Sequence, residues 1–279
     1  MEYLFAQPYW IVVFAFAGIG AGLACGGHTL VRRSIPYKDL VSHNDVAGFL
    51  LAVVGVIYAV LIAFVVIVVW QQYNDAESRY GDEVSSVADI HASARALPLA
   101  DAKRTQKLVH QYVLLMISEE WPAMRTGGNS AKATAVLDTL MEDVRSVDPQ
   151  DGVGTIARER LSEVTQHAFD LRNRRLSDNA ESLPPVLWLS LVFGAVITVG
   201  FGYLFGVEKF RVQLLMTASV AALIALMFVL LVEFDYPFRR DSAISSERWV
   251  QLERYLDVHG DAAWNVPLKN RAALAILTR

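Results

Sequence analysis

The sequence has little of what most enzymes and disulfide-stabilised domains require. Its only cysteine, Cys25, excludes an intrachain disulfide, and the position of this residue inside a long apolar run favours a packing role over a reactive thiol. The phosphate-binding G-x-x-x-x-G-K-[ST], nucleophile G-x-S-x-G and zinc-binding H-E-x-x-H patterns are absent. No two histidines stand at metal-ligand spacing with a third donor nearby. We therefore expect no enzyme, no cofactor and no metal.

Charged residues are also scarce. They make up 19% of the 279 residues and leave a net charge of −4, which argues against a nucleic-acid partner. Hydrophobic residues make up 54%, and four long apolar runs contain no charge at all. The runs are Tyr9–Gly27, Val46–Trp70, Val186–Gly206 and Val212–Val232. As a helix rising about 1.5 Å per residue, each run can cross a bilayer core of about 30 Å.

The four runs predict an all-α membrane protein with four transmembrane helices in two pairs. The first run lacks a basic start and a small-x-small cleavage site, so we expect it to be a retained span and not a secretory signal. The first pair occupies residues 1–70 and the second pair residues 185–238. Residues 71–184, an acidic insert, are expected to form an extramembrane helical bundle, and residues 239–279 a polar tail with an amphipathic segment at 271–277. Membrane lipid would surround the four spans.

The insert has the apolar spacing of helices almost throughout. No glycine or proline follows the second span before Gly81, so we expect this span to continue as one helix to Pro98. The next helix is expected to end at Trp121-Pro122, with the acidic pair Glu119-Glu120 in solvent. Ser130 should cap a third helix. The fourth helix, Thr155–Leu183, should bury an apolar stripe that begins at Ile156, which completes an antiparallel bundle.

Small residues recur on three of the spans at the spacing that lets helices approach closely in lipid. The glycines among them are predicted to be helix-packing positions: Gly18, Gly22 and Gly26 in the first span, Gly48 and Gly55 in the second, and Gly202 and Gly206 in the third. Together they offer more close-packing surface than one four-helix unit needs. We therefore expect a homo-oligomer.

One face of the second span changes from bulky apolar to acidic where the bilayer should end. The candidate pore or gate residues on this face are Leu61, Phe64, Val68, Gln71, Asp75 and Asp82. Such a face is typical of a pore helix, in which an apolar constriction opens into an acidic mouth. It also fits a helix whose apolar half faces lipid and whose acidic half faces water. Spacing alone leaves both interpretations open.

Five sequence blocks resemble one family of bacterial membrane proteins, the bestrophin-like family. These are Val68–Glu77 (VVWQQYNDAE), Ala94–Pro98 (ARALP), Glu120–Pro122 (EWP), Phe201–Gly206 (FGYLFG) and Glu233–Phe238 (EFDYPF). The resemblance covers about Gly48 to Phe238. It implies a comparison with bestrophins, which are oligomeric anion channels with four spans, a helical extramembrane domain and an apolar neck on the second span. By that comparison Phe64 would be a neck residue, whereas the acidic Asp75 and Asp82 fit cations better.

The sequence thus supports two functions. The first is a homo-oligomeric ion channel of the bacterial cytoplasmic membrane, which conducts small inorganic ions along the second span. The second is a non-conducting membrane scaffold or sensor whose bundle binds a protein partner. Basic residues in the two short connections place the bundle outside the cell. The bestrophin comparison places it in the cytoplasm, and we adopt that orientation.

Overall fold

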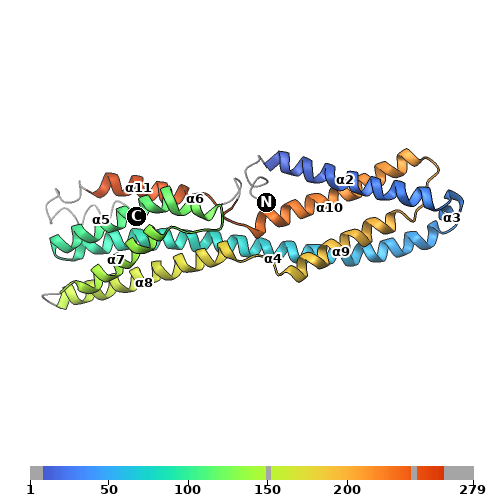
Figure 1. Cartoon of the computed structure of the whole chain (residues 1–279). Helices are drawn as coiled ribbons and strands as arrows, with labels where there is room; N and C mark the ends of the chain where they lie inside the picture. The colour runs from blue at the N-terminus through green and yellow to red at the C-terminus, as the bar shows by residue number, and fades with distance from the viewer. Residues whose placement is uncertain (1–8, 149–151, 240–243, 261–279) are drawn as a thin grey trace. The chain divides into compact units, whose positions relative to one another are not determined.

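A computed structural model describes residues 9–148, 152–239 and 244–260. All regular secondary structure within these ranges is helical, and the chain divides into two compact units (Figure 1). The membrane unit comprises the described residues of Met1–Asp75 and Glu181–Ala243. The bundle unit comprises those of Ala76–Ala180 and Ile244–Arg279. The boundary at Asp75 lies within one unbroken helix, so this helix contributes to both units.

The membrane unit confirms the four predicted spans. Its helices are α2 (Tyr9–Ser34), α3 (Tyr37–Val41), α4 (Asn44–Ser93, of which residues up to Asp75 belong here), α9 (Pro185–Gly202) and α10 (Phe210–Asp235). All but the short α3 carry a stretch long and apolar enough to cross a membrane. The chain is therefore an all-α multi-pass membrane protein.

A buried apolar cluster joins α4, α9 and α10. Tyr58 of α4 is 5% exposed, and its hydroxyl donates to the Leu191 carbonyl of α9 at 3.1 Å. A Cβ at position 194 would collide with the Tyr58 ring, so only glycine allows this approach. The other buried members are Ile62, Val65, Val69, Leu183, Leu191 and Leu231. This cluster fixes which face of α4 points inward within the unit.

A buried carboxylate connects the start of α9 with the end of α10. The Leu183 N–H, just before Pro184-Pro185, donates to Asp235 Oδ1 at 2.7 Å. Proline in the first turn of a helix costs no hydrogen bond, because the N–H that it lacks would have no intrahelical acceptor. The Asp235 carboxylate thus satisfies the last free N–H before α9.

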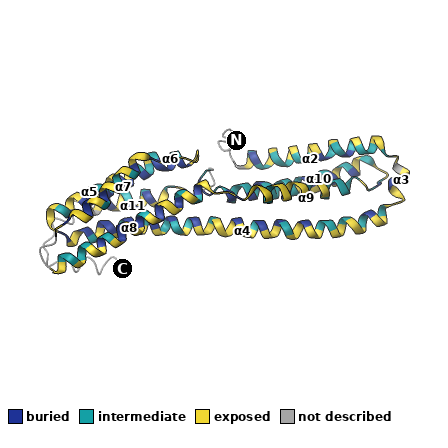
Figure 2. Ribbon diagram, turned by 60° about the horizontal axis from the view of Figure 1, so that its bottom comes forward, coloured by how far each residue is buried: buried dark blue, intermediate teal, exposed yellow. Residues whose placement is uncertain are grey.

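The described part of the bundle unit contains the rest of α4 and seven further helical segments. They are η1 (Ala94–Ala96), α5 (Leu99–Leu115), the π-helix η2 (Met116–Glu120), α6 (Trp121–Met124), α7 (Ala131–Ser146), α8 (Gly152–Ala180) and α11 (Glu247–Gly260). The predicted continuation of the second span is confirmed, since α4 and η1 run without a break to Ala96. Figure 2 shows buried and exposed residues alternating along α4.

The prediction that the helix after Pro98 ends at Trp121-Pro122 is wrong. The helix α5 continues directly as the wider π-helix η2 and then as α6, where Pro122 occupies the first turn. The helix α6 ends at Met124, and the turn that follows it reaches Gly127, whose φ of 80° is left-handed and therefore suits glycine. The predicted cap is confirmed, since Ser130 Oγ accepts a hydrogen bond from the Ala133 N–H at 3.2 Å.

Two further expectations for the bundle differ from the structure. Ile156 is 68% exposed, because the buried stripe of α8 begins only at Leu161. Residues 247–260 form the helix α11 and not part of a polar tail. Trp249, Leu252 and Leu256 are buried in the bundle unit, which the low apolar content of this segment did not suggest. The segment 271–277 lies outside the described residues.

We predict that α11 depends on its apolar contacts for docking. Leu252→Ala should weaken the docking of α11 by about 2 kcal/mol or more, because it leaves a cavity at a side chain that is 6% exposed. Hydrogen–deuterium exchange of the full-length protein should then rise across residues 247–258. Val258→Ala, on the same helix but 66% exposed, should leave the exchange unchanged. Equal protection in both variants would contradict this role for Leu252.

Candidate functional site

The face of α4 predicted to form a pore is largely uncovered by the residues that the structure describes. Phe64 is 66% and Val68 42% exposed. The polar residues Gln71, Asp75 and Asp82 are also exposed. Leu61 differs, because it is half-buried against the Tyr58 cluster. The face is thus free to meet lipid, water or another copy of the chain.

The orientation of this face follows from the buried stripe on the other side of α4. At a spacing of three to four residues, this stripe places apolar side chains inward and leaves the Phe64 face outward. In the membrane unit the stripe comprises Tyr58, Ile62, Val65 and Val69, and in the bundle unit Ala76, Tyr80, Glu83, Val87 and Ile90. Only one member of the stripe, Glu83, is charged.

The predicted packing glycines divide into two groups. A Cβ at five of them would meet no atom of the described residues within 4 Å: Gly18, Gly22, Gly26, Gly55 and Gly202. Gly48 and Gly206 do pack within the chain, against Phe205 and the backbone of Val41 respectively. The close contact between α2 and α10 instead uses Gly20, where a Cβ would lie 3.0 Å from the Ala225 Cβ.

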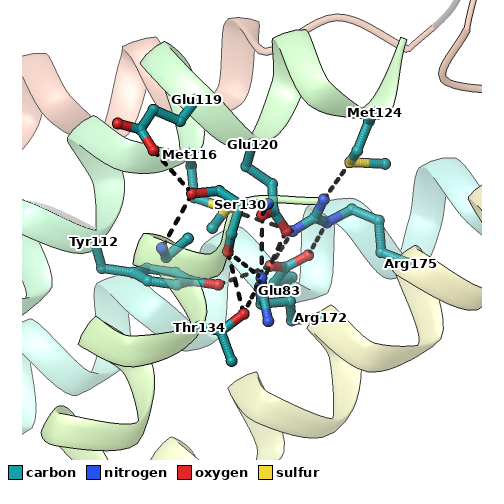
Figure 3. A network of polar contacts seen from close by, with 11 residues as sticks. Glu83, Tyr112, Met116, Glu119, Glu120, Met124, Ser130, Thr134, Arg172 and Arg175 are labelled. Atoms are coloured by element: carbon teal, nitrogen blue, oxygen red, sulfur yellow. Dashed lines mark hydrogen bonds and ion pairs between the residues drawn. The ribbon is translucent and has the colours of Figure 1, made fainter. Parts of the chain in front are cut away.

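Glu83 belongs to a closed set of four buried charges in the bundle unit (Figure 3). Arg175 of α8 donates to Glu83 from Nε at 2.6 Å and from Nη2 at 3.0 Å, and its Nη2 also reaches Glu120 Oε1 at 3.3 Å. Arg172 forms a two-pronged pair with Glu120 at 3.1 and 3.0 Å. All four side chains are at most 2% exposed. Two positive and two negative charges therefore balance without solvent.

Neutral groups supply further hydrogen bonds to the four charged side chains of this network. The Tyr112 hydroxyl donates to Glu83 at 3.3 Å, and the Ser130 N–H donates to Glu120 Oε2 at 2.7 Å. Arg172 Nη2 donates to the Thr134 hydroxyl at 3.0 Å. The Arg175 guanidinium also contacts two methionine sulfurs and lies 5.1 Å from the centre of the Trp121 ring. The network thus ties α4 to η2, α7 and α8.

The environment of the network keeps two of its groups, Arg175 and Tyr112, in fixed ionisation states. Burial by itself lowers the pKa of Arg175, but the charge and hydrogen bonds of Glu83 outweigh this effect and hold that pKa above its ordinary value. Burial, together with the charge of Glu83, raises the pKa of the Tyr112 phenol well above its ordinary value. Arg175 therefore stays charged and Tyr112 neutral at physiological pH, as a fixed structural network requires.

Sequence reasoning missed this network. It assigned Glu119-Glu120 to a solvated face, which fits Glu119 but not Glu120. Glu119 pairs with Lys132 at 2.6 Å, and this hydrogen bond lowers the pKa of the Glu119 carboxyl. Glu120 points inward because the π-helix shifts its side chain to the buried face of the segment. The available signal was the apolar stripe of α8, which continues at helical spacing into Arg172 and Arg175.

Comparisons with known proteins agree with this architecture. Solved structures similar to the chain include a bacterial bestrophin homologue from Klebsiella pneumoniae (11% identity, TM-score 0.66, covering 87% of this chain and 98% of that one). A point mutant of the Klebsiella homologue has 12% identity, a TM-score of 0.64 and coverages of 90% and 99%. A point mutant described only as a membrane protein has 12% identity, a TM-score of 0.68 and coverages of 86% and 97%. At these identities the likeness concerns the fold alone.

The family match is broader than the sequence blocks suggested. No curated protein matches the chain. The Bestrophin-like domain, however, matches residues 18–248, from within α2 to the second residue of α11. The expected core of Gly48 to Phe238 lies inside this range, and the match also takes in most of the first span. Because the domain includes all of α4, α9 and α10, the chain belongs to the bestrophin-like family.

Proposed function

We propose that this protein is a homo-oligomeric ion channel of the bacterial cytoplasmic membrane, with α4 lining the pore and the bundle unit in the cytoplasm. The observation that carries the proposal is the uncovered face of α4, on which exposed Phe64 and Val68 are followed by exposed Gln71 and Asp75. Copies of α4 around an axis would turn this face into an apolar ring with a polar mouth. Bestrophin-like family membership supports this arrangement.

The apolar part of this face is suited to gating. A narrow ring of bulky apolar side chains blocks ions by excluding water, and it needs no charge to do so. The acidic part is suited to attracting small inorganic cations, because a ring of carboxylates raises their local concentration. Phe64 would supply the constriction, and Asp75 and Asp82 would supply the mouth.

The carboxylates should set the ion preference. Asp75→Asn combined with Asp82→Asn should move the reversal potential in a cation gradient toward zero, because the mouth loses its negative charge. Planar bilayers that contain the purified protein would measure this shift. Asp138→Asn with Glu159→Gln removes two exposed acids from α7 and α8, which carry none of the candidate pore residues, and should leave the reversal potential unchanged. The same shift in both double variants would indicate a general surface-charge effect and contradict the assignment.

The open glycines should mediate assembly. Gly22→Leu should lower the oligomeric mass measured by light scattering in lipid nanodiscs. A side chain there meets none of the residues that the structure describes but would separate neighbouring copies. The fold of the dissociated chain should be retained. Gly20→Leu should instead destabilise the chain itself, because its Cβ would press on Ala225. A monomeric wild-type protein would contradict the oligomer and favour the non-conducting scaffold.

A further inference from the structure

Arg248, the second residue of α11, lies against the surface of α4 at Gly81. A Cβ at position 81 would collide with Arg248 Nη1, so the guanidinium occupies the space that a side chain there would take. Arg248 Nη2 donates to Glu77 Oε1 at 3.4 Å, and the guanidinium carbon lies 5.6 Å from the centre of the Tyr80 ring. Three residues of α4 therefore hold this guanidinium in one place.

Contacts of other residues dock α11 onto the bundle unit. Trp249, Leu252 and Leu256 are buried, and the Trp249 N–H donates to the Tyr80 hydroxyl at 3.3 Å. The Arg248 side chain is 45% exposed. We therefore expect α11 to stay docked without the Arg248 guanidinium, so that a substitution of Arg248 changes mainly the charge beside α4.

Gly81 borders the acidic part of the candidate pore face. Ser78 and Ser85, three residues before and four residues after Gly81, are its direct neighbours on the helix surface, and Asp82 follows it in the chain. Ser78, Asp82 and Ser85 are exposed. Because a helix with its side chains is about 10–12 Å across, a guanidinium at Gly81 lies within roughly 10 Å of the Asp82 carboxylate. That separation is about one Debye length at 0.1 M salt, so the charge of Arg248 acts on the mouth.

Arg248 changes the charge of this region by one unit. Its partner Glu77 is 47% exposed and would add a further negative charge beside Ser78 if it were unpaired. The other arginine of α11, Arg254, instead lies 3.8 Å from Glu247 of its own helix and is 67% exposed. Of these two arginines, Arg248 is the one that brings a positive charge to α4.

We propose that Arg248 is a specificity-determining residue of the candidate mouth, where its positive charge limits the preference for cations. This inference rests on the proposed function, because it requires ions to pass the acidic part of α4. Arg248 pairs with Glu77 and offsets part of the charge of Asp82, so it lowers the local concentration of cations that the carboxylates produce. Removal of the guanidinium should make the mouth more negative.

Thiol reactivity tests the electrostatic part of this inference without any ion current. The full-length protein with Cys25→Ala and Ser78→Cys is placed in nanodiscs, and modification by a cationic and by an anionic methanethiosulfonate is timed. The ratio of the two rates reports the local potential, because the exposure and the thiolate fraction of the cysteine affect both rates equally. Arg248→Gln should raise the cation-to-anion ratio about threefold at low ionic strength, as expected for one unit charge at about 10 Å in water.

Three further variants separate charge from structure. Arg248→Lys keeps the charge and should keep the wild-type ratio. Gly81→Ala should displace the guanidinium and raise the ratio, although alanine favours the helix by about 1 kcal/mol and so does not weaken α4. Arg254→Gln removes the same charge from the same helix, away from Glu77, and should leave the ratio unchanged. Hydrogen exchange across residues 247–258 should stay at the wild-type level in Arg248→Gln, which shows that α11 remains docked.

Reversal potentials in planar bilayers then test the effect on ion preference. In a cation gradient, Arg248→Gln should move the reversal potential away from zero, opposite to the shift expected for Asp75→Asn with Asp82→Asn. An unchanged thiol ratio in Arg248→Gln would overturn the inference whether or not the protein conducts. An unchanged reversal potential in Arg248→Gln would also overturn it if the double aspartate variant does shift. A raised thiol ratio in a protein that carries no current would contradict the proposed channel, and with it a role of Arg248 in ion preference.

Discussion

Arg175→Met should lower the stability of the bundle unit by about 3–5 kcal/mol, because it leaves a buried negative charge without its partner. Arg175 is fully buried and donates to both Glu83 and Glu120, so the remaining network has two carboxylates and one guanidinium. Urea unfolding of the full-length protein in detergent, followed by tryptophan fluorescence, would measure the loss. Trp121 is a suitable reporter, because its ring lies 5.1 Å from the Arg175 guanidinium carbon.

Arg174 and Glu83 provide the controls for this prediction. Arg174 is exposed on the same helix, and Arg174→Met should change stability by no more than about 0.5 kcal/mol. Glu83→Gln combined with Arg175→Met restores the charge balance and should recover part of the loss. A double variant that is as unstable as the sum of the two single variants would show that charge balance is not what the network provides.

The spans and helix continuity could be predicted from the sequence because both depend on local patterns. An uncharged run such as Val46–Trp70 has only one stable form in a bilayer, and nothing in the following residues breaks the helix before Pro98. Other features depend on tertiary partners. Glu120 and Arg175 have the side chains of surface residues, and only the ion pairs of the four-charge network make their burial favourable.

The small-residue stripes of the spans also show that a local pattern does not identify tertiary partners. The four-residue spacing selected Gly22 and not Gly20, yet Gly20 is the one that approaches Ala225, whereas Gly22 meets nothing in the described part of the chain. Spacing reports that close packing is possible but does not report which face of the helix uses it. The direction of the Phe64 face became clear only from the burial of Tyr58, Ile62 and Val65 on the opposite side of α4.

Phe64→Ala should raise single-channel conductance or open probability in planar bilayers. Phe64 is 66% exposed on α4, and its ring would be the bulkiest apolar group at the constriction. Truncation to a methyl group widens the ring and lowers the barrier that dewetting places on ions. An increase of about tenfold in current would correspond to about 1.4 kcal/mol removed from this barrier. Lysine at this position would distinguish a water-filled pore from a lipid-facing surface, because a charge at depth in lipid is not tolerated.

Phe193 is the matched control for the gate. It is 60% exposed on α9, so Phe193→Ala makes the same change at a similarly uncovered site of another span. If α4 lines the pore, the current should rise in Phe64→Ala and stay at the wild-type level in Phe193→Ala. Equal currents in both variants would assign Phe64 to a lipid-facing surface. Silence of the wild-type protein and of Phe64→Ala across ions, voltages and pH would contradict the channel and leave the membrane-anchored scaffold as the function to test.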